Sequence, residues 1–487
     1  MKTITFVSFE RHYYDRHQFY YLSAYLKSKG FKVCFISENR FNAAIKRLKT
    51  DKPDLLGYST FSNNGNVYIE FDKFQKNILG IKSIIGGPGA IFNPEFFINT
   101  TIDAVCVGEG EDALIQYLQT DGISANNVIV NGNISTLQYN PLVDLDRLPF
   151  PDREIVYNEE PYLKIMKYRM FLSGRGCPYG CSYCHNHIFN KRFKNCGKVV
   201  RKKSVNYFIE EIKRVNVKYN PRLIVMQDDT FIIDRKWLFE FCERYKKAVK
   251  KPFACNVRAN LVDEEVVKNL KEAGCICCVW SIESGNDYLR NTILKRNMSR
   301  EQIMNTADLL NKYGIKHRIG NIIGIPHETY ATIRETIELN IRCKPHLALA
   351  NTLVPYPHLE ISEYAIKSGY LKPNYYNALP GTFWNMSILN FSHKEKIKFL
   401  KTMYLFPLFV NTPWLYKNLM VRKILYRIPA MLLKYIHVLT DMFKMLTLYP
   451  FGAGFSDILA IVAKYFKYTI TWKIPKYTKA NVKSRSF

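Results

Sequence analysis

Three cysteines on one short loop are the residues of this chain best suited to metal chemistry. Cys177, Cys181 and Cys184 have the spacing C-x3-C-x2-C. Structural zinc, or an iron–sulfur cluster held only by protein, takes four protein ligands, so three thiolates leave one metal valence for a small molecule. From the residues alone, a Cys3His zinc site that uses His185 or His187 remains an alternative.

The loop follows a strand expected at 169–174, and an aromatic residue, Tyr183, precedes its third cysteine. This pattern resembles the cluster loop of the radical S-adenosylmethionine (SAM) enzymes. The resemblance implies that Cys177, Cys181 and Cys184 hold a [4Fe–4S] cluster whose free iron chelates SAM. It also implies that one electron cleaves SAM to a 5′-deoxyadenosyl radical.

The first 122 residues alternate apolar runs with amphipathic segments. Strands are expected at 4–9, 31–37, 55–60, 81–86 and 104–107, and helices at 17–29, 41–50, 65–79 and 111–119. Continuous apolar strands that alternate with helices predict a parallel, doubly wound sheet. Ligands bind at the carboxyl ends of the strands of such sheets.

Short polar or glycine-rich turns follow three of these strands. The candidate ligand contacts are Ser59, Thr60, Gly86, Gly87, Gly108 and Glu109. Glycine lets the backbone approach a bulky ligand, although each turn could equally be an ordinary one. Together the runs at 86–90 and 107–111 resemble the cobalamin-binding domain of cobalamin-dependent radical SAM enzymes, which implies that these six residues contact cobalamin.

One histidine raises the question of a protein ligand to cobalt. Cobalamin domains with a lower histidine carry Asp-x-His-x-x-Gly, and here Asp15, His17 and Tyr20 occupy those places. Tyrosine cannot allow the close backbone approach that glycine does. We therefore favour a solvated histidine at a helix start over a cobalt ligand. Many members of this class lack the histidine, so the prediction of cobalamin does not depend on it.

Strand and helix alternation resumes after a proline-containing connector. Strands are expected at 169–174, 223–228, 253–257, 276–283, 317–324 and 346–354, with helices at 204–218, 235–249, 263–273, 300–313 and 329–343. Six such units predict an incomplete (β/α)6 TIM-type barrel, with chemistry at the carboxyl ends of its strands.

Those strand ends carry polar residues and glycines. The candidates for SAM contact are Asp228, Asp229, Ser281, Glu283, Gly320 and Gly324. By resemblance, the aspartates face the ammonium of SAM, the serine and glutamate face its ribose and methionine, and the glycines admit its adenine. A helix cap or a barrel-corner turn is the plainer interpretation of each. At the last strand His358-Leu359 replaces the Gly-Thr of the family, which puts the contacts there in doubt.

Cys275, Cys277 and Cys278 raise the question of a second cluster. Alternate residues of a strand point to opposite faces, so we expect these thiols to diverge. Buried free cysteine also serves as a small hydrophobe.

The net charge of +28 suggests nucleic acid or an anionic membrane as a partner. Residues 394–487 hold 17 Lys/Arg and 3 Asp/Glu, so the excess is largely C-terminal and nucleic acid is disfavoured. The twelve cysteines fit a reducing cytosol. No signal peptide or spanning segment is expected. We expect a cytoplasmic protein with peripheral membrane association.

A C-terminal helix is expected at 430–448, after Pro429. Lys434, His437, Asp441 and Lys444 form one narrow polar stripe on an otherwise apolar surface. Such a helix either packs its wide apolar face on the barrel or lies in a membrane interface.

The predicted organisation is a Rossmann-like cobalamin-binding domain at 1–140, a linker at 141–167, a radical SAM partial barrel at 168–375 and a basic, aromatic, mostly helical region at 376–487. The resemblance implies methyl transfer from cobalamin to an unactivated carbon of a small-molecule or lipid-linked substrate. It also implies a reductase such as flavodoxin or ferredoxin.

Three other functions share some of these sequence features. A radical SAM oxidoreductase or cyclase without methyl transfer stays open. A tRNA methylthiotransferase-like enzyme would carry three N-terminal cysteines, and residues 1–122 offer only Cys34 and Cys106. A non-enzymatic metal-binding scaffold leaves the polar strand ends unexplained. The sequence does not name the substrate.

Overall fold

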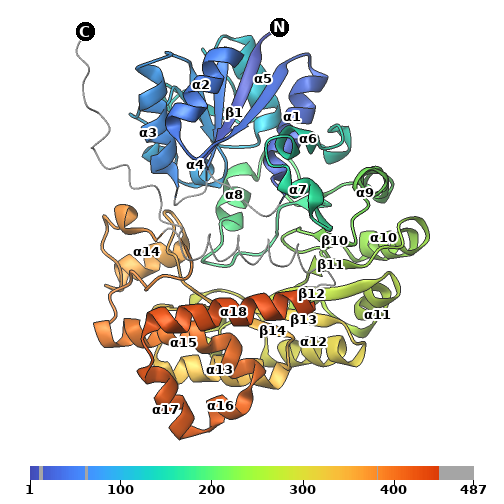
Figure 1. Cartoon of the computed structure of the whole chain (residues 1–487), viewed down its shortest axis with the longest axis vertical. Helices are drawn as coiled ribbons and strands as arrows, with labels where there is room; N and C mark the ends of the chain where they lie inside the picture. The colour runs from blue at the N-terminus through green and yellow to red at the C-terminus, as the bar shows by residue number, and fades with distance from the viewer. Residues whose placement is uncertain (10–14, 61–63, 381, 449–487) are drawn as a thin grey trace.

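The computed structural model describes residues 1–9, 15–60, 64–380 and 382–448, and shows two sheets stacked along the long axis of the molecule (Figure 1). The first sheet has the order β2-β1-β3-β4-β5-β6, and only β6 runs antiparallel to its neighbour. Its strands are β1 (Thr3–Ser8), β2 (Lys32–Ser37), β3 (Leu55–Ser59), β4 (Ser83–Gly86), β5 (Ala104–Cys106) and β6 (Val128–Val130).

Helices cover both faces of this sheet, because its strands are apolar on both sides. They are α1 (His17–Ser28), α2 (Phe41–Asp51), α3 (Gly65–Lys76), α4 (Pro88–Phe92) and α5 (Gly110–Gln119). Ile4 and Phe6 of β1 pack into one core, and Val7 packs into the other. The doubly wound domain is confirmed, and α4 is an additional helix that the sequence pattern does not predict.

The second sheet has the order β14-β13-β12-β11-β10-β7, with every pair parallel. Its strands are β7 (Tyr168–Phe171), β10 (Leu223–Met226), β11 (Phe253–Asn256), β12 (Cys275–Glu283), β13 (Lys316–Ile323) and β14 (Leu347–Thr352). In the part of the chain that the structure describes, β7 and β14 do not pair with each other. The predicted incomplete barrel is therefore confirmed.

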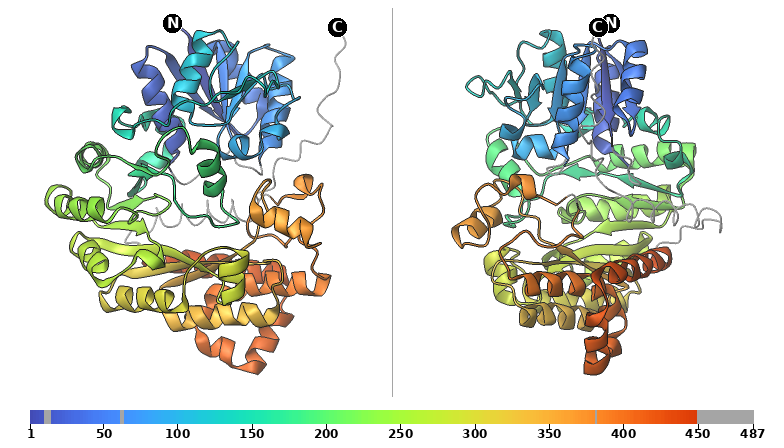
Figure 2. Two further views of the ribbon diagram at one scale, coloured as in Figure 1. Left: turned by 180° about the vertical axis from the view of Figure 1, so that it is seen from behind. Right: turned by 60° about the vertical axis from the view of Figure 1, so that its left-hand side comes forward.

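Five helices form the outer layer of this barrel (Figure 2): α9 (Val205–Tyr219), α10 (Arg235–Ala248), α11 (Glu264–Glu272), α12 (Arg300–Lys312) and α13 (Tyr330–Cys343). Each begins at a residue whose side chain accepts a hydrogen bond from the first turn, as at Asp234, Asp263 and Ser299. The polar cap therefore fixes where each helix starts behind its strand.

The connector packs against both domains through one buried carboxylate. Asp15 accepts hydrogen bonds from the hydroxyls of Tyr20 (2.9 Å) and Tyr157 (2.5 Å) and from the amide of Met170 (2.7 Å). Arg153 lies 3.1 Å away. Burial raises the pKa of Asp15, but these partners bring it below its usual value. The residues before β7 are thus fixed to the first domain.

The C-terminal region extends the helical layer beyond β14. After α14 (Glu360–Lys367) come α15 (His393–Asn411), α16 (Pro413–Lys417), α17 (Leu419–Arg427) and α18 (Ala430–Leu448). Side chains of α15 share a core with α13 and β14. The last turn of α18 reaches the sheet, where Leu448 packs with Leu223, Ala254 and Cys277. Within the described residues, no helix combines the length and hydrophobicity needed to cross a bilayer.

Candidate functional site

The loop after β7 starts in a conformation that only glycine allows. Its first residues form β8 (Gly174–Arg175), which pairs with β9 (Arg201–Lys202). A Cβ at Gly174 would lie 2.4 Å from the carbonyl oxygen of Arg201, and one at Gly176 would lie 2.5 Å from that of Val199. Gly176 also has a φ of +87°. This close approach fixes the direction in which the three cysteines leave the sheet.

The loop gathers Cys177, Cys181 and Cys184 at the carboxyl edge of the barrel. Cys177 and Cys181 are buried and Cys184 is half-buried, and all three are free thiols. Burial raises the pKa of Cys184 to about 11, so its thiol is protonated at neutral pH and metal binding must release the proton.

Nitrogen donors point at two of these sulfurs. Nη1 of Arg258 and Nη1 of Arg296 lie 3.7 and 3.8 Å from Sγ of Cys181. The side-chain amide of Asn186 lies 3.7 Å from Sγ of Cys184. Donors aimed at sulfur stabilise thiolate charge, which is what an anionic cluster needs from its surroundings.

The three loop thiols are not arranged as ligands of a single metal ion. In a tetrahedral zinc site with Zn–S bonds of about 2.3 Å, ligand sulfurs lie about 3.8 Å apart. Among the described residues, these cysteines do not form a group of ligand atoms within 4.8 Å of one another, with or without a histidine. Instead His185 stacks on Phe92, with ring centroids 4.1 Å apart, and Nδ1 of His187 lies 3.2 Å from the carbonyl oxygen of Cys181. The residues therefore fit a [4Fe–4S] cluster better than zinc.

A second group of thiols has single-ion spacing but lies in the apolar core. Sγ of Cys275 lies 4.0 Å from that of Cys255 and 3.9 Å from that of Cys278. The expectation that the thiols of 275–278 diverge by simple alternation is wrong for this pair, because a bulge in β12 shifts the register. Only Cys277 faces the other core. Thiolates there would lose their hydration, so we interpret the group as packed neutral thiols.

Glu283 and Ser281 lie together at the end of β12. Glu283 is buried with a φ of +69°, a strained conformation for a residue with a side chain. The hydroxyl of Tyr183 donates a hydrogen bond to the carboxylate of Glu283 at 2.9 Å, and burial raises the pKa of Glu283. Gly320 makes room for Ser281, since a Cβ there would lie 2.8 Å from its Oγ. At Gly324, φ is +86° and a Cβ would meet Oγ of Ser387 at 3.3 Å.

Arg296 connects this pair to the cluster loop. Its Nη2 donates to the carbonyl oxygen of Ser281 at 3.1 Å, while Nη1 faces Cys181. Glu283 helps to raise the pKa of the Arg296 guanidinium. Sequence reasoning missed Arg296 and Arg258, because each follows its strand at a distance that no motif marks.

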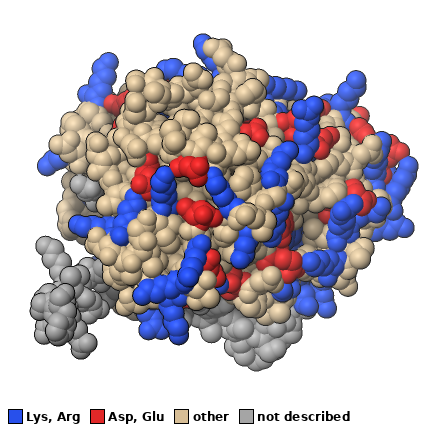
Figure 3. Space-filling view, turned by 90° about the horizontal axis from the view of Figure 1, so that it is seen from above, with Lys and Arg blue, Asp and Glu red and all other residues tan. Residues whose placement is uncertain are grey.

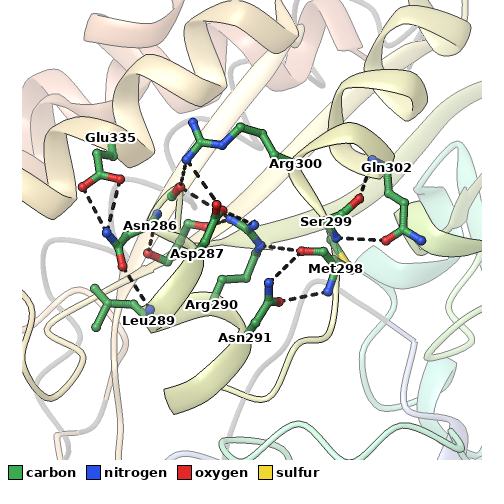
Figure 4. A network of polar contacts seen from close by, with 12 residues as sticks. Asn286, Asp287, Leu289, Arg290, Asn291, Met298, Ser299, Arg300, Gln302 and Glu335 are labelled. Atoms are coloured by element: carbon green, nitrogen blue, oxygen red, sulfur yellow. Dashed lines mark hydrogen bonds and ion pairs between the residues drawn. The ribbon is translucent and has the colours of Figure 1, made fainter.

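A polar network holds the loop that carries Arg296 (Figure 4). The side chain of Arg290 is fully buried and donates to the carbonyl oxygens of Met298 (2.9 Å) and Ser284 (3.0 Å). Asn291 exchanges two hydrogen bonds with the backbone of Met298. The amide of Arg296 in turn donates to the carbonyl oxygen of Arg290 at 2.9 Å. The network therefore fixes the position of Arg296.

The two aspartates after β10 have different surroundings. Asp228 accepts hydrogen bonds from the amide (3.0 Å) and hydroxyl (2.5 Å) of Ser173 and pairs with Lys202 at 2.9 Å. Asp229 is exposed and accepts a hydrogen bond from the side-chain amide of Asn186 at 3.1 Å. Because Asn186 also contacts the thiol of Cys184, Asp229 is the carboxylate that faces the cluster loop.

The predicted cobalamin residues lie along one edge of the first sheet. Gly87 has a φ of +86°, and a Cβ there would lie 2.8 Å from Oγ of Ser59 and from the carbonyl oxygen of Thr60. A Cβ at Gly108 would lie 2.9 Å from the ring of Phe193, in α8 (Asn186–Phe193). These glycines thus allow protein packing, whereas Gly86 has only a Cβ contact at 3.6 Å. Cobalamin contact at this edge stays a prediction.

Glu109 lies in an ion-pair cluster between the domains. Its carboxylate is 2.8 Å from Nη1 of Arg175 and 2.7 Å from Nη2 of Arg201, and Glu111 is 2.6 Å from Arg175. Burial raises the pKa of Glu109, but the two guanidinium groups bring it down to about 2. Arg175 precedes Cys177 by two residues, so this cluster connects the predicted cobalamin edge to the cluster loop.

Two further contacts cross the same boundary. The stack of His185 on Phe92 joins the cluster loop to α4. His358, with a φ of +59°, takes a left-handed conformation where the family has glycine, and its Nε2 lies 3.4 Å from the carboxylate of Glu95. The replacement that left contacts in doubt therefore forms an interdomain contact.

His17 is not solvated, contrary to the interpretation that we favoured. It is buried at the start of α1, and burial lowers its pKa to about 3. Its Nε2 has no hydrogen-bond partner among the described residues, which exclude 10–14. The side chain is therefore neutral at physiological pH.

Comparisons with known proteins agree with this geometry. The family model of the radical SAM superfamily matches residues 171–339, and that of the B12 binding domain matches residues 13–118. An uncharacterised methyltransferase of Pyrococcus horikoshii is 27% identical over 379 residues, which cover 75% of this chain and 81% of the relative.

Two solved structures share the fold. The cobalamin-dependent SAM radical enzyme OxsB, solved with aqua-cobalamin and SAM, has a TM-score of 0.61 at 17% identity, covering 96% of this chain and 75% of its own. The radical SAM methyltransferase TsrM of Kitasatospora setae, solved with cobalamin and a [4Fe–4S] cluster, has a TM-score of 0.61 at 15% identity, covering 75% of this chain and 76% of its own.

Replacing Cys177, Cys181 or Cys184 with Ala should remove the iron–sulfur absorbance, because two thiolates cannot hold the cluster. Iron and sulfide content of anaerobically purified protein measures this. Cys277→Ala and Cys278→Ala are matched controls that should keep full iron and lower the free energy of unfolding by about 1 kcal/mol. Full iron in a loop variant would remove that cysteine from the site, and lost iron in a control would establish a second centre.

Replacing Glu109 with Gln tests whether this residue stabilises the contact between the domains or binds cobalamin. Without its charge two guanidinium groups lose a partner, so the free energy of unfolding of the cofactor-free protein should fall by up to about 3 kcal/mol. Chemical denaturation measures the change, and Glu265→Gln, at an exposed ion pair, should cost less than about 1 kcal/mol. Unchanged stability together with lost cobalamin binding would instead make Glu109 a cofactor contact.

Replacing His17 with Ala should leave the absorption spectrum of bound cobalamin unchanged, as expected for a base-off form without histidine ligation. Spectra of the reconstituted full chain test this. A shift of the cobalt bands in the variant would identify His17 as the lower ligand.

Proposed function

Because this chain belongs to the radical SAM superfamily and carries a B12-binding domain, we propose that it is a cobalamin-dependent radical SAM methyltransferase acting on an unactivated carbon of a small molecule. The observation that carries the proposal is the meeting of the two domains at the cluster loop. Glu109 and Glu111 of the first domain pair with Arg175, two residues before the first cluster cysteine.

When bound, the [4Fe–4S] cluster supplies the electron that splits SAM into methionine and a 5′-deoxyadenosyl radical, and cobalamin supplies the methyl group. Cys177, Cys181 and Cys184 would hold the cluster. The protein contributes ligands, orientation and charge.

Charged groups beside the loop suit the two polar ends of an amino acid. The guanidinium groups of Arg258 and Arg296 can pair with a carboxylate, and the carboxylate of Asp229 can hold an ammonium. Glu283 and Ser281 lie next to Arg296, as the resemblance implies for the ribose side of SAM. We assign the SAM site to this group, with Asp228 in a structural role.

Aromatic side chains enclose the loop on the side of the first domain. The ring of His185 lies between that of Phe92, at 4.1 Å, and that of Tyr356, at 5.1 Å. Such a wall supports the proposal because a radical site must exclude water and competing hydrogen donors.

The proposed partners follow from charge and chemistry. A reductase such as a flavodoxin or ferredoxin would deliver the electron. On the face seen from above, basic and acidic side chains are interspersed (Figure 3), without the continuous basic surface that nucleic acid binding needs.

We propose a cytoplasmic enzyme, because its free cysteines suit a reducing compartment. A lipid-linked substrate with peripheral membrane contact belongs to the same proposal, since the helices beside the barrel expose apolar side chains.

Replacing Arg296 with Met should keep the cluster but weaken SAM binding about 10- to 100-fold, because a charge-assisted hydrogen bond is lost. Binding to the anaerobically reconstituted protein, and transfer of label from methyl-labelled SAM, measure the effect. Arg244→Met, on the outer face of α10, is the matched control and should bind SAM as the wild type does. Normal SAM affinity of the Arg296 variant would remove this arginine from the site. Failure of the wild type to bind cobalamin would contradict the proposed function.

A further inference from the structure

The helix α18 packs against the protein with its polar stripe. His437 is 1% and Asp441 5% exposed, and the ring of His437 contacts the carbonyl oxygen of Tyr404 (3.2 Å) in α15. Leu433 and Val438 are buried beside them. Two of the four residues of the stripe are therefore buried against the protein, and Lys434 and Lys444 are half-buried.

The opposite face of α18 is apolar and exposed. Leu432, Leu439 and Phe443 are 54%, 53% and 66% exposed, and their spacing places them on one side of the helix. Met431 at the start of the helix is 68% exposed. This is the reverse of a helix that covers a core in water, so the face requires an apolar neighbour.

The adjoining helices α16 and α17 project past the lower side of the barrel (Figure 1) and expose the same kind of side chain. Trp414 is 61%, Leu419 62%, Met420 71% and Ile424 53% exposed. Together with α18, eight large apolar side chains lie exposed between residues 414 and 443. An indole at such a surface suits the level of lipid headgroups.

The positive charge of these helices favours an anionic bilayer as the neighbour of the exposed apolar face. Residues 413–429 contain four Lys/Arg (Lys417, Arg422, Lys423 and Arg427) and no acidic residue. In α18, Lys434 and Lys444 lie half-buried on the polar stripe, and its acidic residue, Asp441, is buried. A second copy would bring the same positive face and repel it. The sequence of 449–487 is also basic, with seven Lys/Arg and one Asp, so it offers no opposite charge either. An anionic bilayer offers both an apolar phase and negative charge.

We propose that α16, α17 and α18 dock this protein on an anionic membrane surface, with the outward face of α18 lying in the plane of the interface. Since α18 also contacts the barrel sheet through Leu448, docking would hold the barrel at the bilayer. Membrane docking itself does not depend on the proposed function. The substrate class does rest on the proposed function, and docking narrows that class to a lipid or lipid-linked compound.

Co-sedimentation of the full chain with vesicles tests the docking itself. Binding should be strong to vesicles of equal parts phosphatidylcholine and phosphatidylglycerol, and at least tenfold weaker to phosphatidylcholine alone. It should also weaken between about 0.1 M and about 1 M salt, as the screening length falls from about 10 Å to about 3 Å. No binding to the anionic vesicles, or equal binding to both kinds, would overturn the proposal.

Pairs of substitutions test whether the exposed apolar face of α18 is the membrane-binding surface. Leu439→Ser with Phe443→Ser should lower vesicle affinity at least tenfold. Ile123→Ser with Val217→Ser, at two exposed apolar sites elsewhere, should change it less than twofold. A chain ending at residue 448 should still bind. Loss of binding in that chain alone, or a dimer in solution that the α18 variant dissociates, would give the face a different occupant and overturn the proposal.

Iron content, cobalamin content and SAM cleavage should be unchanged in all these variants. A wild-type protein without iron, cobalamin or SAM cleavage would contradict the proposed function, but the vesicle result would still stand.

Discussion

The arrangement of the site depends on the ion pairs that the carboxylate of Glu109 forms with Arg175 and Arg201. The proposed chemistry needs cobalamin on one domain and the cluster on the other in a fixed relation. A buried acid between two guanidinium groups sets that relation more sharply than apolar packing does, because its hydrogen bonds are directional. The buried contacts of Asp15 with Arg153 and Tyr157 fix the same two bodies at a second point.

Around the cluster loop the chain uses charge where sequence patterns show little. Arg258 and Arg296 converge on one sulfur from loops after different strands. The second of them depends on Arg290, a buried cation whose hydrogen bonds hold a loop of irregular backbone. Glu283 keeps a strained backbone beside them. Strain and buried charge persist only where the surrounding structure holds them, which is typical of functional sites.

The C-terminal region shows that amphipathicity alone does not give the orientation of a helix. The periodicity of α18 is the same whether its polar stripe faces water or protein. Two residues of the stripe, His437 and Asp441, are buried, and His437 contacts a carbonyl oxygen of α15 and the ring of Trp384 at 5.4 Å. The apolar side that remains outside is then a property of the assembled surface.

Local patterns in the sequence predict the two α/β sheets, the order in which their strands follow one another and the three cysteines proposed to hold the cluster, because period-2 and period-3.6 patterns and a fixed loop spacing are local properties. They do not determine which polar groups meet. Asp228 and Asp229 are neighbours in sequence, yet one pairs with Lys202 and the other faces Asn186, since the strand end turns them apart. Glu109 is predicted to contact cobalamin, and the structure shows that it also pairs with arginines of the other domain. The bulge in β12, the burial of His437 and Asp441 in α18 and the burial of His17 likewise follow from contacts between segments that are distant in the chain, and such contacts leave no local pattern in the sequence.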